Sequence, residues 1–189
     1  MPPKVKVTKE DIIKRTLDLV REKGAEAINA RAISSSLNCS TQPIFSNFES
    51  MEQLQENTIS AAYELYLDFI KKEVASCKYP QYKSFGMAYI RFAKEERELF
   101  KLLFMRNRTE EDISLSPDFK DSVQLIMSIN ALTYEKAMLV HLEMWSFVHG
   151  IATMIATSFL HLEWELISEM ISDAYHGIIT MHLSEEDKQ

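Results

Sequence analysis

Apolar residues recur at intervals of three and four along most of the chain, which is the spacing of amphipathic α-helices. The first such stripe consists of Ile12, Ile13, Thr16, Leu17 and Val20. Thr8, with Asp11 three residues later, forms a capping-box pattern before this stripe, and Gly24 follows it as a stop signal. No segment alternates between apolar and polar residues as a half-buried strand does. The sequence therefore predicts an all-α fold with about nine helices.

Two short helices joined by a tight turn are predicted between residues 29 and 48, which is the arrangement of a helix-turn-helix. Asn29 is a suitable N-cap for the first helix, residues 30–37, and Asn38 suits the left-handed position after it. Ser40 is predicted to cap the second helix, which runs to about Asn47. The two helices can pack through Ile33, Leu37, Ile44 and Phe48. Such a unit can present its second helix, with short polar side chains outward, to the DNA major groove.

Residues 8–54 resemble the DNA-binding domain of the TetR family of transcriptional regulators. The resemblance rests on Arg31–Leu37, Ser40–Phe48 and Ser50–Leu54. It implies a helix-turn-helix DNA-binding domain at residues 1–50 and a larger helical ligand-binding and dimerisation domain at residues 51–189. The DNA-contacting residues that it implies are Lys6, Arg31, Ser40, Thr41, Gln42, Pro43, Phe45, Ser46 and Asn47.

Three positions depart from the family pattern. Phe45 stands where a Tyr is usual, which removes a hydroxyl that reaches a phosphate. Asn47 replaces a His or Tyr but keeps a donor, and Met51 replaces a Lys. Because phosphate contacts supply much of the salt-dependent affinity, we expect weaker non-specific DNA binding than in a typical member, or compensation by Arg31 and a small basic arm, Lys4, Lys6 and Lys9.

Six further helices are predicted after the motif. Their expected bounds are residues 51–76, 81–94, 95–105, 117–128, 133–158 and 163–182. Ser116, Pro117 and Asp118 form a good start signal, with Ser as the cap and Pro at the first helical position. The polar residues 106–115 are expected to form an exposed loop.

The resemblance implies a mostly apolar effector pocket among the body helices. The residues assigned to it are Tyr66, Phe69, Tyr89, Phe92, Phe100, Phe104, His141, Trp145 and His149. His141, Trp145 and His149 recur every four residues and would supply its polar component. Core packing with hydrogen-bonded histidines is the alternative interpretation for any one of them.

The last two helices are expected to pair with their copies in a homodimer, as a four-helix bundle. The predicted interface consists of Ala152, Ile155, Phe159, Trp164, Ile167, Ile171 and Ile178. Small residues such as Gly150 and Ala156 would allow the helices to approach closely. The alternative is that these faces are buried inside one subunit.

Charge is unevenly distributed along the chain. Residues 1–50 hold eight Lys and Arg against six Asp and Glu, a net charge of +2; the whole chain carries −7, so residues 51–189 carry −9. A mildly basic head on an acidic body fits a protein that meets phosphate at one end. The two cysteines, Cys39 and Cys77, do not form a disulfide framework, which favours a reducing, cytoplasmic setting.

Other classes of protein fit the sequence less well. Residues 144–162 lack charged side chains, but six polar residues and a glycine make a poor membrane span. A di-iron bundle needs two Glu-x-x-His pairs, and only Asp173–His176 has comparable spacing. The sequence holds neither a glycine-rich nucleotide motif nor a His-Glu-x-x-His motif. We therefore expect no cofactor, no metal, no membrane partner and no enzymatic activity.

The sequence favours a homodimeric regulator, most often a repressor in this family, that a small molecule of unknown identity releases from a double-stranded DNA operator. The alternative is an all-α protein–protein interaction module whose DNA-binding head is vestigial. Phe45 and Met51 support that alternative, because each lacks a phosphate-binding group.

Overall fold

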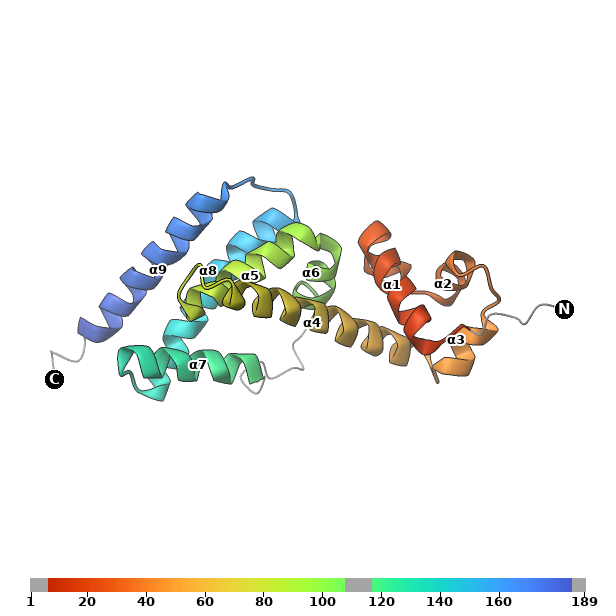
Figure 1. The fold of residues 1–189 in the computed structure, drawn as a ribbon, viewed down its shortest axis with the longest axis horizontal. Helices are drawn as coiled ribbons and strands as arrows, with labels where there is room; N and C mark the ends of the chain where they lie inside the picture. The colour runs from red at the N-terminus through yellow and green to blue at the C-terminus, as the bar shows by residue number, and fades with distance from the viewer. Residues whose placement is uncertain (1–6, 108–116, 185–189) are drawn as a thin grey trace. The chain divides into compact units, whose positions relative to one another are not determined.

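The computed structural model describes residues 7–107 and 117–184, and within these ranges the chain is all-helical (Figure 1). Nine α-helices and one 3₁₀ turn are described, with no strand among them, so the predicted fold class is confirmed. The helices are α1 (Lys9–Lys23), α2 (Ala30–Ser36), α3 (Gln42–Asn47), α4 (Met51–Ala75), α5 (Gln81–Glu95), α6 (Arg97–Phe104), α7 (Pro117–Asn130), α8 (Tyr134–Ala156) and α9 (Trp164–Ser184), and the turn is η1 (Ala25–Ala27).

The chain divides into two compact units. One comprises the chain as far as Asp68 together with Glu95–Arg106, and the other comprises Phe69–Lys94 with the chain from Asn107 onward. We call the first the head unit and the second the body unit. The division falls inside α4, and α6 belongs to the head unit although it follows α5 in the sequence. The predicted domain boundary at residues 50 and 51 stays a prediction.

Local signals define both ends of α1 and the start of α2 as predicted. Thr8 and Asp11 form a reciprocal capping box at α1, and α1 ends at Gly24 with φ of 80°. The Asn29 side chain caps α2 by accepting a hydrogen bond from the Ala32 N–H at 2.8 Å. After α2, Asn38 adopts φ of 52°, in the left-handed region. Each of these residues satisfies or replaces a backbone group that a helix end leaves unpaired.

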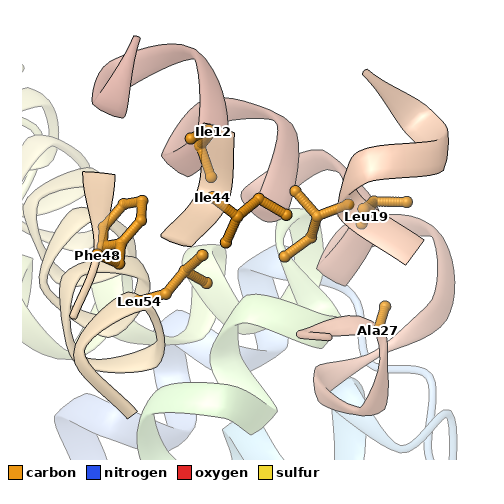
Figure 2. Packing of buried hydrophobic residues seen from close by; sticks show 7 residues of the cluster. Ile12, Leu19, Ala27, Ile44, Phe48 and Leu54 are labelled. Atoms are coloured by element: carbon orange, nitrogen blue, oxygen red, sulfur yellow. The ribbon is translucent and has the colours of Figure 1, made fainter. Parts of the chain in front are cut away.

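Seven buried residues form the core of the head unit (Figure 2). They are Ile12, Leu19, Ala27, Ile33, Ile44, Phe48 and Leu54. Ile12 and Leu19 come from α1 and Ile44 from α3, so the core seats the second helix of the motif directly on the first helix of the chain. α6 also packs against α1, where the Arg21 guanidinium pairs with both carboxylate oxygens of Glu96 at 2.8 and 2.9 Å.

The start of α3 differs from the sequence prediction. Thr41, not Ser40, is the residue before the helix, and its side chain makes no capping hydrogen bond. Thr41 has φ of −71° and ψ of −13°, whereas a capping side chain needs extended backbone. The prediction of Ser40 as the cap was therefore wrong. Pro43 lies in the first turn, as expected, where the missing N–H costs little.

The body unit is built on α8. It packs against α7 and α9, and seven buried residues form their shared core: Phe119, Val123, Ile126, Leu132, Ala137, Val140 and Ile179. α5 approaches α8 closely, because a Cβ added at Gly86 would lie 3.4 Å from Val148 and 3.7 Å from Ile171. Among the described residues α8 alone has the length and composition of a membrane span, a test that core helices of other proteins also pass.

The body helices begin and end within a few residues of their predicted bounds. Thr133 caps α8 by accepting a hydrogen bond from the Lys136 N–H. The predicted cap Ser116 and most of the predicted loop at residues 106–115 lie outside the described residues.

Replacing Ile44 by Ala should destabilise the head unit by about 2–5 kcal/mol, because Ile44 is fully buried and the truncation leaves a cavity between α1 and α3. Urea denaturation followed by circular dichroism measures the change. The matched control is Phe45→Ala at the next position, whose side chain is 55% exposed. Equal stability of the two variants would contradict the assignment of Ile44 to the core.

Candidate nucleic-acid interface and effector site

The turn between α2 and α3 is a Schellman motif. The Cys39 N–H donates to the Ser34 carbonyl at 3.0 Å, and the Asn38 N–H donates to the Ser35 carbonyl at 3.2 Å. These two bonds pair carbonyls that the last turn of α2 would otherwise leave unsatisfied. The polypeptide then reverses direction tightly and enters α3 four residues later. The sequence thus produces a helix-turn-helix with a short, hydrogen-bonded turn.

Most of the residues predicted to contact DNA lie on the surface of the head unit. Arg31, Ser40, Thr41, Gln42, Phe45 and Ser46 are exposed, and Pro43 and Asn47 are partly buried. Lys6 lies outside the described residues. The exposed residues leave α3 with one buried side, formed by Ile44, and one solvent-facing side.

Two polar side chains of α3 are hydrogen-bonded to the helix itself. The Ser46 hydroxyl donates to the Gln42 carbonyl at 2.8 Å, and the Asn47 amide donates to the Pro43 carbonyl at 2.7 Å. Ser46 therefore presents an oxygen as an acceptor, and Asn47 keeps one of its two amide hydrogens for another partner. The side chains of Thr41 and Gln42 make no hydrogen bond within the described residues.

Packing explains one of the three departures from the family pattern. Met51 is partly buried and packs against the head core. A Lys at this position could reach outward with its charge, whereas Met adds apolar surface to the core that seats α3. Phe45, in contrast, keeps 55% of its surface exposed. Packing within the head unit therefore does not account for the phenyl ring at position 45.

The residues predicted to line the effector pocket divide between the two units. Tyr66, Phe100 and Phe104 belong to the head unit, where the rings of Tyr66 and Phe104 meet edge to face at 5.2 Å. Phe69, Tyr89, Phe92, His141, Trp145 and His149 belong to the body unit. In the body unit the Phe69 and Phe92 rings also meet edge to face, at 5.3 Å. The assignment of these residues to one pocket stays a prediction.

Two Tyr–His pairs join α5 to α8 in the body unit. The Tyr82 hydroxyl lies 2.9 Å from His141 Nδ1, and the Tyr89 hydroxyl lies 2.9 Å from His149 Nδ1. Tyr82 was not among the predicted residues, although its signal is present: it lies seven residues before Tyr89, on the same helix face, as His141 lies eight before His149. Burial lowers the pKa of His141 to about 4 and also lowers the pKa of His149, so both are neutral hydrogen-bonding groups near pH 7.

A buried carboxylate lies near the C-terminal end of α4. Glu73 is only 6% exposed, and its oxygen pairs with Arg91 Nε at 2.9 Å. The Arg91 guanidinium carbon lies 4.3 Å from the centroid of the Trp164 ring. This stack links the ends of three helices, α4, α5 and α9, within the body unit. Trp164, predicted at the dimer interface, thus contacts a cation of its own chain.

Four residues of the predicted dimer interface are buried in the single chain. Ala152 and Ile155 of α8 and Ile167 and Ile171 of α9 are at most 6% exposed. Their three-and-four spacing lies on the faces that α8 and α9 turn toward their own subunit, and their assignment to the dimer interface stays a prediction. Phe159, between the two helices, is 79% exposed, and Ile178 is partly buried.

Between pH 6.5 and pH 4 the body unit should lose stability as the pH falls, because the unfolded chain binds a proton near pH 6.5 and folded His141 only near pH 4. The expected slope from this group is about 1.4 kcal/mol per pH unit. His141→Gln retains hydrogen-bonding atoms without the titration and should flatten the slope by that amount in urea denaturation at several pH values. The exposed His161→Gln is the control, and equal slopes for wild type and His141→Gln would contradict the assignment.

A search of curated proteins gives no match to this chain. The scan against family models matches residues 82–174 to the tetracycline repressor-like C-terminal domain. This segment begins in α5 and ends in α9, so it covers most of the body unit, whereas the resemblance seen in the sequence lies in the head. The two observations come from different parts of the chain and agree. The chain belongs to the TetR family of transcriptional regulators.

Proposed function

We propose that this protein is a cytoplasmic, homodimeric repressor that binds a double-stranded DNA operator through α2 and α3 and releases it when a small molecule binds the body. The observation that carries the proposal is the solvent-facing side of α3, seated by Ile44 on a rigid core behind a hydrogen-bonded turn. A rigid helix with exposed polar side chains is the form in which a protein inserts into the major groove. Regulation, and not catalysis, is accordingly the role we assign to the chain.

Cations on the head unit are available to bind phosphate. Arg31, Lys9 and Lys14 make no ion pair within the described residues, whereas Arg15 pairs with Glu22 and Arg21 pairs with Glu96. Arg31 lies in α2, which crosses the DNA backbone when a helix-turn-helix docks. We therefore assign positioning on the phosphates to Arg31 and its neighbours, and reading of the bases to α3.

The outward faces of α8 and α9 support a homodimer. On α8 the exposed apolar residues include Leu139 and Leu142, and on α9 they include Leu166 and Leu183. Gly150 and Gly177 lie inside these helices, where Gly costs about 1 kcal/mol relative to Ala. A Cβ added at either glycine would have no neighbour within 4 Å, so packing inside the subunit does not require them. Close approach of a partner helix explains both glycines.

Release of DNA would follow from a population shift. The operator favours one spacing of the two heads, and a body-bound effector favours another, so each ligand weakens binding of the other by the same factor. α4 is the covalent link, because this one helix contributes residues to both units. The aromatic residues and neutral Tyr–His pairs of the body suit a largely apolar effector with a few hydrogen-bonding groups.

A protein–protein interaction module is the second candidate, and the exposed phenyl ring of Phe45 is the observation that favours it. The two candidates differ in DNA binding. Fluorescence anisotropy of the purified protein with DNA from immediately upstream of its own gene, against a scrambled competitor at two salt concentrations, separates them. Preference for the native DNA supports the repressor, whereas no binding at low salt supports the interaction module.

Arg31→Ala should weaken binding to all DNA sequences alike, because a phosphate contact carries no sequence information. Losing one such contact from each subunit of a dimer should reduce the slope of log Kd against log salt by about 2. Anisotropy titrations from 50 to 300 mM KCl measure the slope. Lys120→Ala, an exposed charge change in the body unit, is the control and should leave the slope unchanged. A loss confined to the preferred sequence would show that Arg31 reads a base.

Phe159→Glu should raise the dissociation constant of the dimer at least about tenfold, because it places a charge on an apolar contact between subunits. Phe159 is 79% exposed in the single chain, so the subunit itself should keep its fold and helicity. Sedimentation velocity over a concentration series measures the change. Ile129→Glu, at an exposed apolar position of α7, is the matched control. An unchanged dimer for Phe159→Glu would place the interface elsewhere.

A further inference from the structure

The segment that would read DNA carries no formal charge. From Ala32 to Phe48 the sequence contains no Asp, Glu, Lys or Arg, so the second half of α2, the turn and all of α3 are neutral. The commonest specific contact to a guanine is a bidentate Arg or Lys on its O6 and N7 atoms. α3 has no side chain that makes this contact. Its exposed face must distinguish base pairs by neutral hydrogen bonds and by apolar contact.

Gln42 and Phe45 dominate the exposed face of α3. They are three residues apart, so they are neighbours on one side of the helix, with Cβ atoms about 5–6 Å apart. Ile44, which fills the core, projects from a different side. The Ser46 hydroxyl is turned back to the Gln42 carbonyl, which leaves Gln42 as the amide on this face without a hydrogen bond inside the described residues.

Each of these two side chains matches one feature of an A·T pair. A glutamine amide pairs with adenine N6 and N7, and an exposed phenyl ring packs against the C5-methyl group of thymine. Base pairs are stacked about 3.4 Å apart, so a 5–6 Å separation spans one or two steps. Phe45 is 55% exposed in the free protein, and this apolar surface would leave water on contact with a methyl group.

We propose that α3 selects A·T pairs, with Gln42 on an adenine and Phe45 on the C5-methyl group of a thymine one or two base pairs away. The inference rests on the proposed function and names the ligand of its site. The Phe at this position, which loses a phosphate contact, thereby gains a base contact. A 5-methylcytosine presents the same methyl group and should replace the thymine in this contact.

The first step of the test is selection of duplexes from a random DNA library by the full-length protein at low salt. Each selected half-site should contain an adenine and a thymine one or two pairs apart. Thymines are then replaced one at a time by uracil, which removes only the methyl group. At one thymine position of each half-site, a single replacement should weaken binding roughly three- to fivefold, the factor that corresponds to burial of one methyl group.

The second step assigns the methyl contact to Phe45. In Phe45→Ala the uracil penalty at that thymine should vanish, whereas in Ser46→Ala it should persist. A 5-methylcytosine·guanine pair at the same place should bind better than an unmethylated cytosine·guanine pair for the wild type, and equally for Phe45→Ala. Gln42→Ala should relax selection at the adenine alone. Circular dichroism checks that each surface variant retains its fold.

The outcomes separate this inference from the proposed function. If no sequence is enriched, the DNA-binding function itself is refuted, and the inference with it. A second outcome is that sequences are enriched, but Gln42→Ala or Phe45→Ala changes the base preference at a G·C position. The proposed repressor function would then be retained, and the A·T inference would be overturned. A uracil penalty of equal size in wild type and Phe45→Ala would also overturn it.

Discussion

The burial of Ile44 between α3 and α1 is the contact on which the remaining interpretation depends. α3 is six residues long, far too short to be stable alone, and its amide groups gain few intrahelical bonds. Its conformation is therefore maintained by packing of Ile44, and of Phe48 just after it, against Ile12 and its neighbours. A helix held by two apolar side chains on one side presents the opposite side to solvent as a rigid surface. Base reading needs such rigidity, since hydrogen bonds to base edges tolerate little displacement.

Charged and neutral helices are separated along residues 1–50. Among residues 1–50 the cations lie in α1, α2 and the residues before α1, whereas α3 is neutral. Phosphate affinity and sequence discrimination would thus depend on different helices and could change independently. α6 extends the same head unit through the bidentate Arg21–Glu96 pair, although it lies after α5 in the chain. Any displacement of α6 would therefore act on α1, against which α3 packs.

In the body unit, α8 and α9 each have two apolar faces with different roles. The inner faces, which include Ile155 and Ile167, are buried against their own subunit. The outer faces carry exposed apolar residues and one glycine each, and a Cβ added at either glycine would meet no neighbour within 4 Å. The Tyr–His pairs across α5 and α8 satisfy polar groups within a largely apolar interior, because an unpaired buried hydroxyl or imidazole is costly.

The sequence by itself determined the helices, most of their caps and the family. Thr8, Asn29, Asn38 and Thr133 act through bonds to residues three or four positions away, and such local signals can be read from the chain directly. The prediction of Ser40 as the cap was wrong because α3 begins after Thr41, whose backbone is helical and whose side chain makes no capping bond. Periodicity also found the apolar stripes of α8 and α9, but it could not assign each stripe to the subunit's interior or to its surface. Only the tertiary structure decided that assignment. It alone paired Tyr82 with His141 and Glu73 with Arg91. Contacts between distant segments depend on how helices pack, and not on the spacing of residues within any one helix.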